Sequence, residues 1–263
     1  MNVIVILIFI LFILMIFIGG KRGAKSFFTL IFNFFIIFVM LILIAGKFNP
    51  IKITFIGCVV ISYVTLFYIN GFNKKTVAAL ISVTLVVLLT MLTTYKIGYN
   101  AKIQGFGNEQ AETIAYIPMY VQLNFAQIVI CQVLIGLLGA IIDVAITISS
   151  SMNEIYKGDK NIAAYSLFKS GMNIGKDILG TMTNTLFFAY IGGFMTLLIY
   201  FNQLHYSLSD ILNAKVFGAE IFQILCGGIG IIFIIPITAF VASRILYIKK
   251  KNKNIGEKNE AAE

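Results

Sequence analysis

The sequence predicts an all-α protein, a polytopic membrane helical bundle of about seven transmembrane helices with its N-terminus outside and its C-terminus in the cytoplasm. Of the 263 residues, 59% are hydrophobic and only 12% are charged, whereas soluble domains are about 45–50% apolar. The apolar residues form seven runs close to the roughly 20 residues that a helix needs to cross a bilayer. The basic residues gather in alternate connections, as Lys and Arg do on the cytoplasmic side.

The predicted spans follow one another at regular spacing, which favours one bundle over separate domains. They are Asn2–Ile18, Ser26–Ala45, Ile53–Asn70, Thr76–Tyr95, Phe125–Ser151, Ile178–Phe201 and Val216–Tyr247. The first run lacks the basic start and the small-residue cleavage site of a signal peptide, so we expect it to remain as a helix. Residues 1–248 are therefore predicted to form the bundle and residues 249–263 a basic cytoplasmic tail.

The orientation follows from the 20 Lys and Arg residues, because such residues in short loops are retained in the cytoplasm. If the chain crosses seven times, only five of these basic residues lie on the outer side, and the other fifteen lie on the inner side. The five are Lys47, Lys52, Lys96, Lys102 and Lys215. The formal charge of +9 sits in loop ends and in the tail. Anionic lipid is thus the expected partner of these charges, and nucleic acid is not.

Two connections carry further patterns. The longest outer stretch, residues 96–124, is expected to place Tyr116 and Tyr120 at the level of the lipid headgroups. In the inner connection, Ile162, Tyr165 and Phe168 recur at about three-residue spacing, which predicts a short helix lying flat on the inner leaflet.

The fifth span carries a line of small and polar residues. On a helix one face collects Gly136, Gly139, Ala140, Asp143, Thr147, Ser150 and Glu154, with Gln132 on nearly the same line. The next span carries a second line of Asn173, Asp177, Gly180, Thr181 and Asn184. One short inner connection separates the two antiparallel spans, so the two lines could face each other. The small residues Gly136, Gly139 and Gly180 are expected to allow close helix packing.

Two interpretations of these polar residues remain open. Interhelical hydrogen bonds contribute about 0.6–2 kcal/mol each, so the groups can serve only to hold two helices together. Glu154 and Asp177 lie near water at helix ends, where a carboxylate costs little. Asp143 lies deep in its span, where a charged Asp costs about 2.5–3.5 kcal/mol even on the mildest scale, and no Lys or Arg occupies the interior of a span. Such a carboxyl must be protonated, paired with a cation or open to water. The candidates for a proton, cation or polar path are Asp143, Thr147, Glu154, Asn173, Asp177, Thr181 and Asn184.

The blocks GAIIDVAITISSSMNE and SGMNIGKDILGTMTNTLFFAYIGG resemble the YibE/F family of bacterial multi-pass membrane proteins. The resemblance implies a helical bundle in the bacterial cytoplasmic membrane. Its signature positions would be Asp143, Glu154, Gly175, Asp177, Gly180, Thr181, Asn184 and Thr185. Longer members carry an outside region ahead of the bundle, and the role of that region would here be absent or supplied by a partner. A weaker similarity to proton-driven secretion and efflux proteins of the RND type raises the expectation of ion coupling.

These patterns are consistent with two functions. The first is transport or export assistance, with Asp143 responding to protons or cations. The alternative is a non-catalytic membrane subunit that docks a partner protein, a longer paralogue or a second copy. An enzyme is not expected, because no nucleophile and base surround the single histidine, His205. Cys58, Cys131 and Cys226 all fall inside spans as small hydrophobic residues, so neither a metal site nor a cofactor is predicted.

Overall fold

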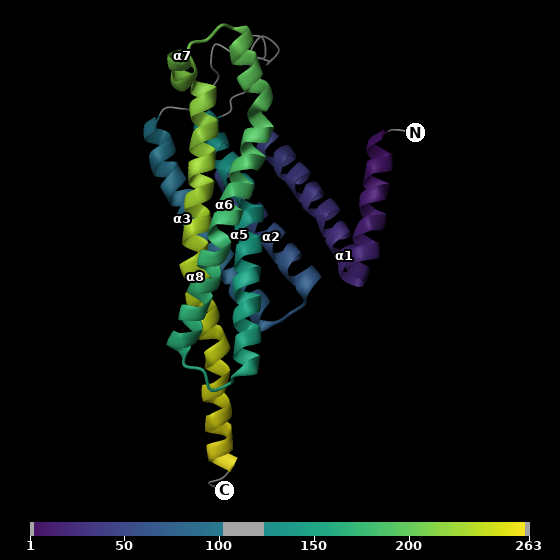
Figure 1. The fold of residues 1–263 in the computed structure, drawn as a ribbon, viewed down its shortest axis with the longest axis vertical. Helices are drawn as coiled ribbons and strands as arrows, with labels where there is room; N and C mark the ends of the chain where they lie inside the picture. The colour runs from purple at the N-terminus through teal and green to yellow at the C-terminus, as the bar shows by residue number, and fades with distance from the viewer. Residues whose placement is uncertain (1–2, 102–123, 261–263) are drawn as a thin grey trace.

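The structure is a computed structural model that describes residues 3–101 and 124–260, and these form helices joined by short turns, with no strand among them (Figure 1). The helices are α1 (Val3–Ala45), α2 (Pro50–Asn70), α3 (Lys74–Ala101), α5 (Phe125–Gly158), α6 (Ala164–Gln203), α7 (Leu208–Asn213) and α8 (Lys215–Glu260). Six of the described helices are long and apolar enough to cross a membrane. The predicted all-α membrane fold is therefore confirmed.

The first helix, α1, consists of two arms. Its 43 residues contain one non-helical residue, Gly20, with φ 53° and ψ −134°, a conformation that glycine adopts readily because it has no Cβ. The chain folds back at this point, so the Phe12 and Phe27 rings lie 4.7 Å apart. The arms approach so closely that a Cβ on Gly23 would overlap the Met15 carbonyl. The sequence Gly19–Gly23 thus separates two apolar segments that the structure joins in one bent helix.

The structure does not confirm the count of seven, because the first two predicted spans are the two arms of α1. The direction of the chain nevertheless reverses at Gly20. In Figure 1 the chain descends along the first arm of α1, rises along the second, and then alternates through α2, α3, α5, α6 and α8. The C-terminus consequently lies at the lower end of the bundle, and the N-terminus lies above the bend.

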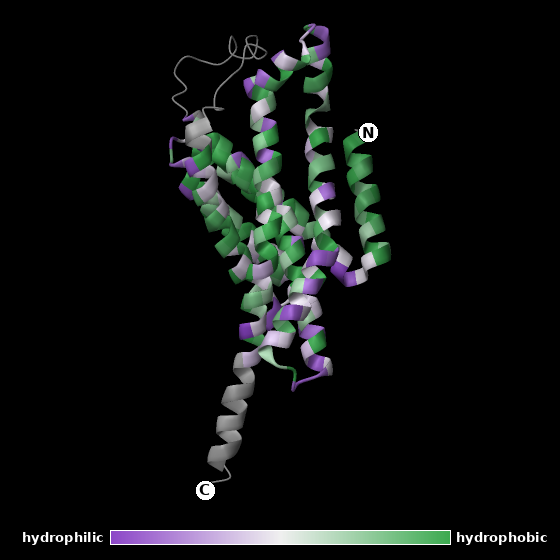
Figure 2. Cartoon of the chain, turned by 60° about the vertical axis from the view of Figure 1, so that its left-hand side comes forward, coloured by the Kyte–Doolittle hydropathy of each residue, from purple (hydrophilic) through white to green (hydrophobic). Residues whose placement is uncertain are grey.

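Helix α5 is the centre of the bundle. It packs on α2, α3, α6 and α8, and α3 and α8 also contact each other, whereas α1 packs chiefly on α2. The contact face of α5 contains Leu134, Leu137, Ile141 and Ile148, all with no exposed surface. Their spacing of three, four and seven residues keeps them on one side of the helix. Apolar colour dominates the helices in Figure 2, and hydrophilic residues are most frequent near the turns at both ends.

The second arm of α1 packs on α2, and two side-chain contacts show how. Asn33 Nδ2 donates a hydrogen bond to Thr65 Oγ1 over 3.0 Å. Farther along, the Met40 side chain fills the space that the missing side chain of Gly57 leaves. Helix α2 itself begins where the Asn49 side chain accepts hydrogen bonds from the first backbone amides and Pro50 occupies the first turn, an arrangement that favours helix initiation.

Helix α6 corrects the prediction of a separate surface helix. It runs without interruption from Ala164 to Gln203. Tyr165 and Phe168, expected to lie on a separate flat helix, therefore belong to the first two turns of α6, and Ile162 precedes it. Tyr165 is 76% exposed, but Leu167 is fully buried. The reason is close packing, because Gly171 lies against Met152 and Ala239, which holds this end of α6 on α5 and α8.

Three further features of the chain are the outer stretch before α5, the short helix α7 and the proline in α8. Most of the outer stretch, including Tyr116 and Tyr120, lies outside the described residues. Helix α7 begins with a capping box, in which the hydrogen bonds from Ser207 keep the pKa of Asp210 below its usual value. Helix α8 continues through Pro236 without a break.

Candidate functional site

The polar line predicted for the fifth span lies on the uncovered face of α5. Its exposed members are Gln132, Gly136, Gly139, Asp143, Thr147 and Glu154. The opposite side of the helix carries the buried residues that contact the other helices. The neighbours of α5 therefore leave Gly139, Asp143, Thr147 and Glu154 uncovered, whereas the outer end of the line, at Gln132 and Gly136, contacts α6 and α8.

Asp143 occupies the middle of this line. It is exposed, and its carboxyl group makes no hydrogen bond and no ion pair with any residue whose side chain the structure describes. A charged carboxylate facing lipid at this depth is costly. The side chain must therefore meet water, a cation or another polypeptide, or it must carry a proton.

A polar contact that the sequence analysis missed lies at the outer end of the line. Gln132 Nε2 donates a hydrogen bond to Gln223 Oε1 of α8 over 2.8 Å, and Gln223 is only 6% exposed. The Tyr190 hydroxyl of α6 approaches the same point, next to Gly136, and Glu220 lies one turn before Gln223 on α8. The spacing of Glu220 and Gln223 on neighbouring turns was the available signal, but nothing in the sequence paired them with Gln132.

The inner end of the line is a surface ion pair. Lys157 Nζ donates to Glu154 Oε1 over 3.0 Å, with side chains that are 63% and 65% exposed. Asn153 Nδ2 donates to the same oxygen over 3.4 Å. An exposed pair of this kind has little effect on stability, so its relevance lies in keeping the inner end of the line polar.

The second polar line, on α6, is exposed as well. Asn173, Asp177, Gly180, Thr181 and Asn184 all lie on its open surface. The opposite side of α6 carries Gly175, which packs on Ile235 of α8, so the polar line points away from α8. In the described parts of the chain no hydrogen bond joins it to the line on α5, and Thr181 instead donates to the Ile178 carbonyl over 2.9 Å. The expected facing of the two lines is not confirmed.

The three glycines predicted for packing behave differently. A Cβ on Gly136 would overlap the Tyr190 hydroxyl and approach Gln223 Nε2 to 2.8 Å, so this residue permits close packing as predicted. Gly139 and Gly180 have nothing within 4 Å of such a Cβ. The neighbouring helices of the described chain cover other faces of α5 and α6, so close packing at these two positions is not tested within the chain. Contact with another molecule stays a prediction.

Comparison with known proteins supplies one match. A family sequence model described as YibE/F-like protein matches residues 7–248, which include both polar lines. No curated protein and no solved structure matches this chain.

Proposed function

The chain belongs to the YibE/F-like family, and from this premise we propose that it transports protons or a cation across the bacterial cytoplasmic membrane along the polar face of α5. The process would be transport or export, and no catalytic role is proposed. Asp143 would bind and release the ion. Thr147 would offer a hydroxyl one turn away on the same face of α5.

The spacing of the polar residues on α5 carries this proposal. Asp143 lies eleven residues from Gln132 and eleven from Glu154. At about 1.5 Å per residue the whole line is about 33 Å long, close to the roughly 30 Å of the hydrocarbon core. One carboxyl at mid-depth, with polar groups at both ends and no fixed partner within the described chain, suits an ion-binding step.

We further propose that both arms of α1 cross the membrane, which makes seven passes with the N-terminus outside. Each arm has about the required length, since the 43 residues of α1 would extend about 65 Å if they were straight. This topology places Lys21, Arg22 and Lys25 on the same side as Lys74 and Lys157. That side is then cytoplasmic.

Reporter fusions test the topology. A reporter fused after Glu263 is expected to report cytoplasm, and one inserted near Gly105 is expected to report the outside. A third, placed before Val3, should also report the outside, because α1 bends at Gly20 and each arm crosses. A cytoplasmic signal from the third reporter would mean that only one arm crosses, and signals from Gly105 and Glu263 on the same side would contradict the alternation of the spans.

Ion flux in vesicles tests the transport itself. Purified full-length protein in liposomes that enclose a pH-sensitive dye should carry protons, or a cation detected by its own dye, faster than empty liposomes. Gly139→Leu should reduce this flux at least tenfold although it still folds, because a Cβ at this position has no described atom within 4 Å and the leucine would project onto the line between Gln132 and Asp143. Parent flux equal to that of empty liposomes would contradict the proposal.

The alternative function is that of a non-catalytic subunit that docks another membrane protein. The open space over Gly139 and Gly180 supports it, because exposed small residues let a second helix approach closely. Cysteine placed at position 139 or 180 would then form cross-links in native membranes, and the liposomes would show no flux. The two proposals thus give opposite results in the flux measurement.

A further inference from the structure

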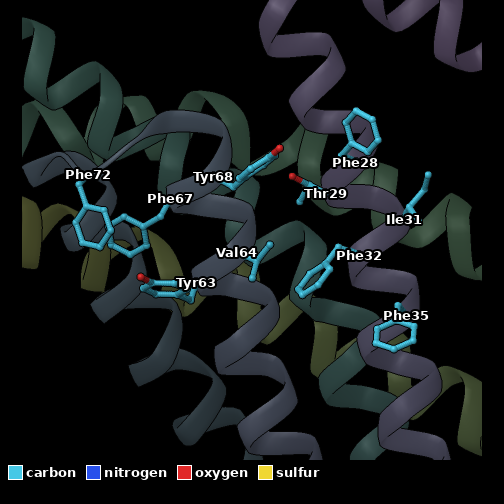
Figure 3. Close-up of a pocket in the computed structure, with 10 residues that line it drawn as sticks. All are labelled: Phe28, Thr29, Ile31, Phe32, Phe35, Tyr63, Val64, Phe67, Tyr68 and Phe72. Atoms are coloured by element: carbon cyan, nitrogen blue, oxygen red, sulfur yellow. The ribbon is translucent and has the colours of Figure 1, made fainter.

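An apolar cavity of about 780 Å³ lies between the second arm of α1 and α2. Figure 3 shows aromatic rings on both of its walls, with Phe28, Phe32 and Phe35 on α1 and Tyr63 and Phe67 on α2. Its size is within the range of about 300–1,000 Å³ that is typical of small-molecule sites. The cavity is open to the side, since α1 packs chiefly on α2. It can therefore be entered from the membrane.

One end of this cavity is basic. Lys25 Nζ lies 5.8 Å from the centre of the Tyr68 ring, which is part of the cavity wall. Figure 3 places the hydroxyl groups of Thr29 and Tyr68 at one and the same end. Lys21 is one turn before Lys25, and Phe28 and Phe32 continue the same helix face. A single face of α1 therefore passes from cations to aromatic rings.

The cations at this end have no acidic partner in the described chain. Lys21, Arg22 and Lys25 are all exposed, and none of them forms an ion pair with a residue whose side chain the structure describes; the pair of Glu154 and Lys157 lies at a distance. The first acidic residue in the sequence is Glu109. Positive charge at this position is thus available to a ligand.

We propose that this cavity binds an anionic phospholipid of the leaflet on the basic side of the bundle. Its acyl chain would lie between the rings of α1 and α2, and its phosphate would meet Lys21, Arg22 and Lys25. The charge selects an anionic over a zwitterionic headgroup, and the apolar length of the cavity selects a lipid over a free phosphate. The site is independent of the ion path proposed on α5, because α1 is attached to the other side of α2.

The chain contains no tryptophan, so one introduced tryptophan gives a clean fluorescence signal. Phe35→Trp and Tyr63→Trp place it on opposite walls of the cavity, and Phe188→Trp places it on the exposed surface of α6 as a control. The full-length variants are reconstituted in phosphatidylcholine vesicles. The vesicles also hold the same mole fraction of either brominated phosphatidylglycerol or brominated phosphatidylcholine, whose bromine atoms quench nearby tryptophan.

Brominated phosphatidylglycerol is expected to quench the cavity tryptophans with at least tenfold higher relative affinity, and both lipids should quench the control tryptophan equally. Changing Lys21, Arg22 or Lys25 to Gln should lower the preference about fivefold for each cation removed. The pair Lys47→Gln and Lys52→Gln, at the other end of the bundle, should leave it unchanged.

Equal quenching by the two lipids at the cavity, or an undiminished preference after all three cations are removed, would overturn the proposal. Weak quenching by both would overturn it too, since another polypeptide would then cover the cavity. Native mass spectrometry of the chain without tryptophan gives a second measurement if those variants do not fold. The parent should retain phosphatidylglycerol in preference to phosphatidylcholine, and the variant with three neutralised cations should not.

Discussion

Asp143→Asn is expected to abolish ion flux and at the same time to stabilise the protein. Asparagine keeps the shape and most of the hydrogen-bonding capacity of aspartate, but it cannot gain or lose a proton. A charged Asp at mid-depth costs about 2.5–3.5 kcal/mol, so its removal should raise the melting temperature of the purified protein. Loss of activity together with a gain of stability is typical of a functional group held in an unfavourable position.

Three measurements check this result. Flux into dye-loaded liposomes and complementation of the phenotype that deletion produces report activity, and thermal melting in detergent reports stability. Infrared spectroscopy follows the carboxyl band as the pH is changed, and the band assigned to Asp143 should be missing in the variant.

Glu154→Gln is the matched control. It also removes one carboxylate from the same face of α5, but that carboxylate lies in an exposed ion pair with Lys157, so flux and melting should change little. If Asp143→Asn leaves flux, titration and complementation as in the parent, Asp143 is not the coupling group, and the docking function becomes the better account.

Gly136→Leu is expected to prevent or strongly reduce folding, whereas Gly139→Leu, three residues away on the same face, should leave the fold intact. At Gly136 even a Cβ would overlap the Tyr190 hydroxyl, and the larger leucine would also break the contact of Gln132 with Gln223. Overpacking of this kind costs about 1–3 kcal/mol and sometimes more. At Gly139 the space is open, and replacement of glycine in a helix can add up to about 1 kcal/mol through helix propensity.

The yield of monodisperse protein and its melting temperature measure this difference. Gly136→Ala combined with Tyr190→Phe should melt higher than Gly136→Ala alone, because the second change removes the oxygen that the new methyl group meets. Equal damage by Gly136→Leu and Gly139→Leu would show that another molecule covers the open face of α5, and it would argue for docking through that face.

The sequence was sufficient to predict the class of fold, the positions of the apolar segments and the polar line on α5. These properties depend on local composition and on helical periodicity. In a bilayer a backbone that must satisfy its own hydrogen bonds has few choices other than a helix. The same periodicity placed Gln132, Asp143 and Glu154 on one face before any neighbour of that helix was known.

The tertiary structure decided which helix faces are covered. It separated Gly136, where a Cβ would overlap Tyr190, from Gly139, where a Cβ would have no described atom within 4 Å. It also paired Gln132 with Gln223, 91 residues away, and placed the second arm of α1 on α2 with an aromatic cavity between them. Such contacts depend on the crossing of helices that are distant in sequence, and the periodicity of one helix contains no information about its neighbours.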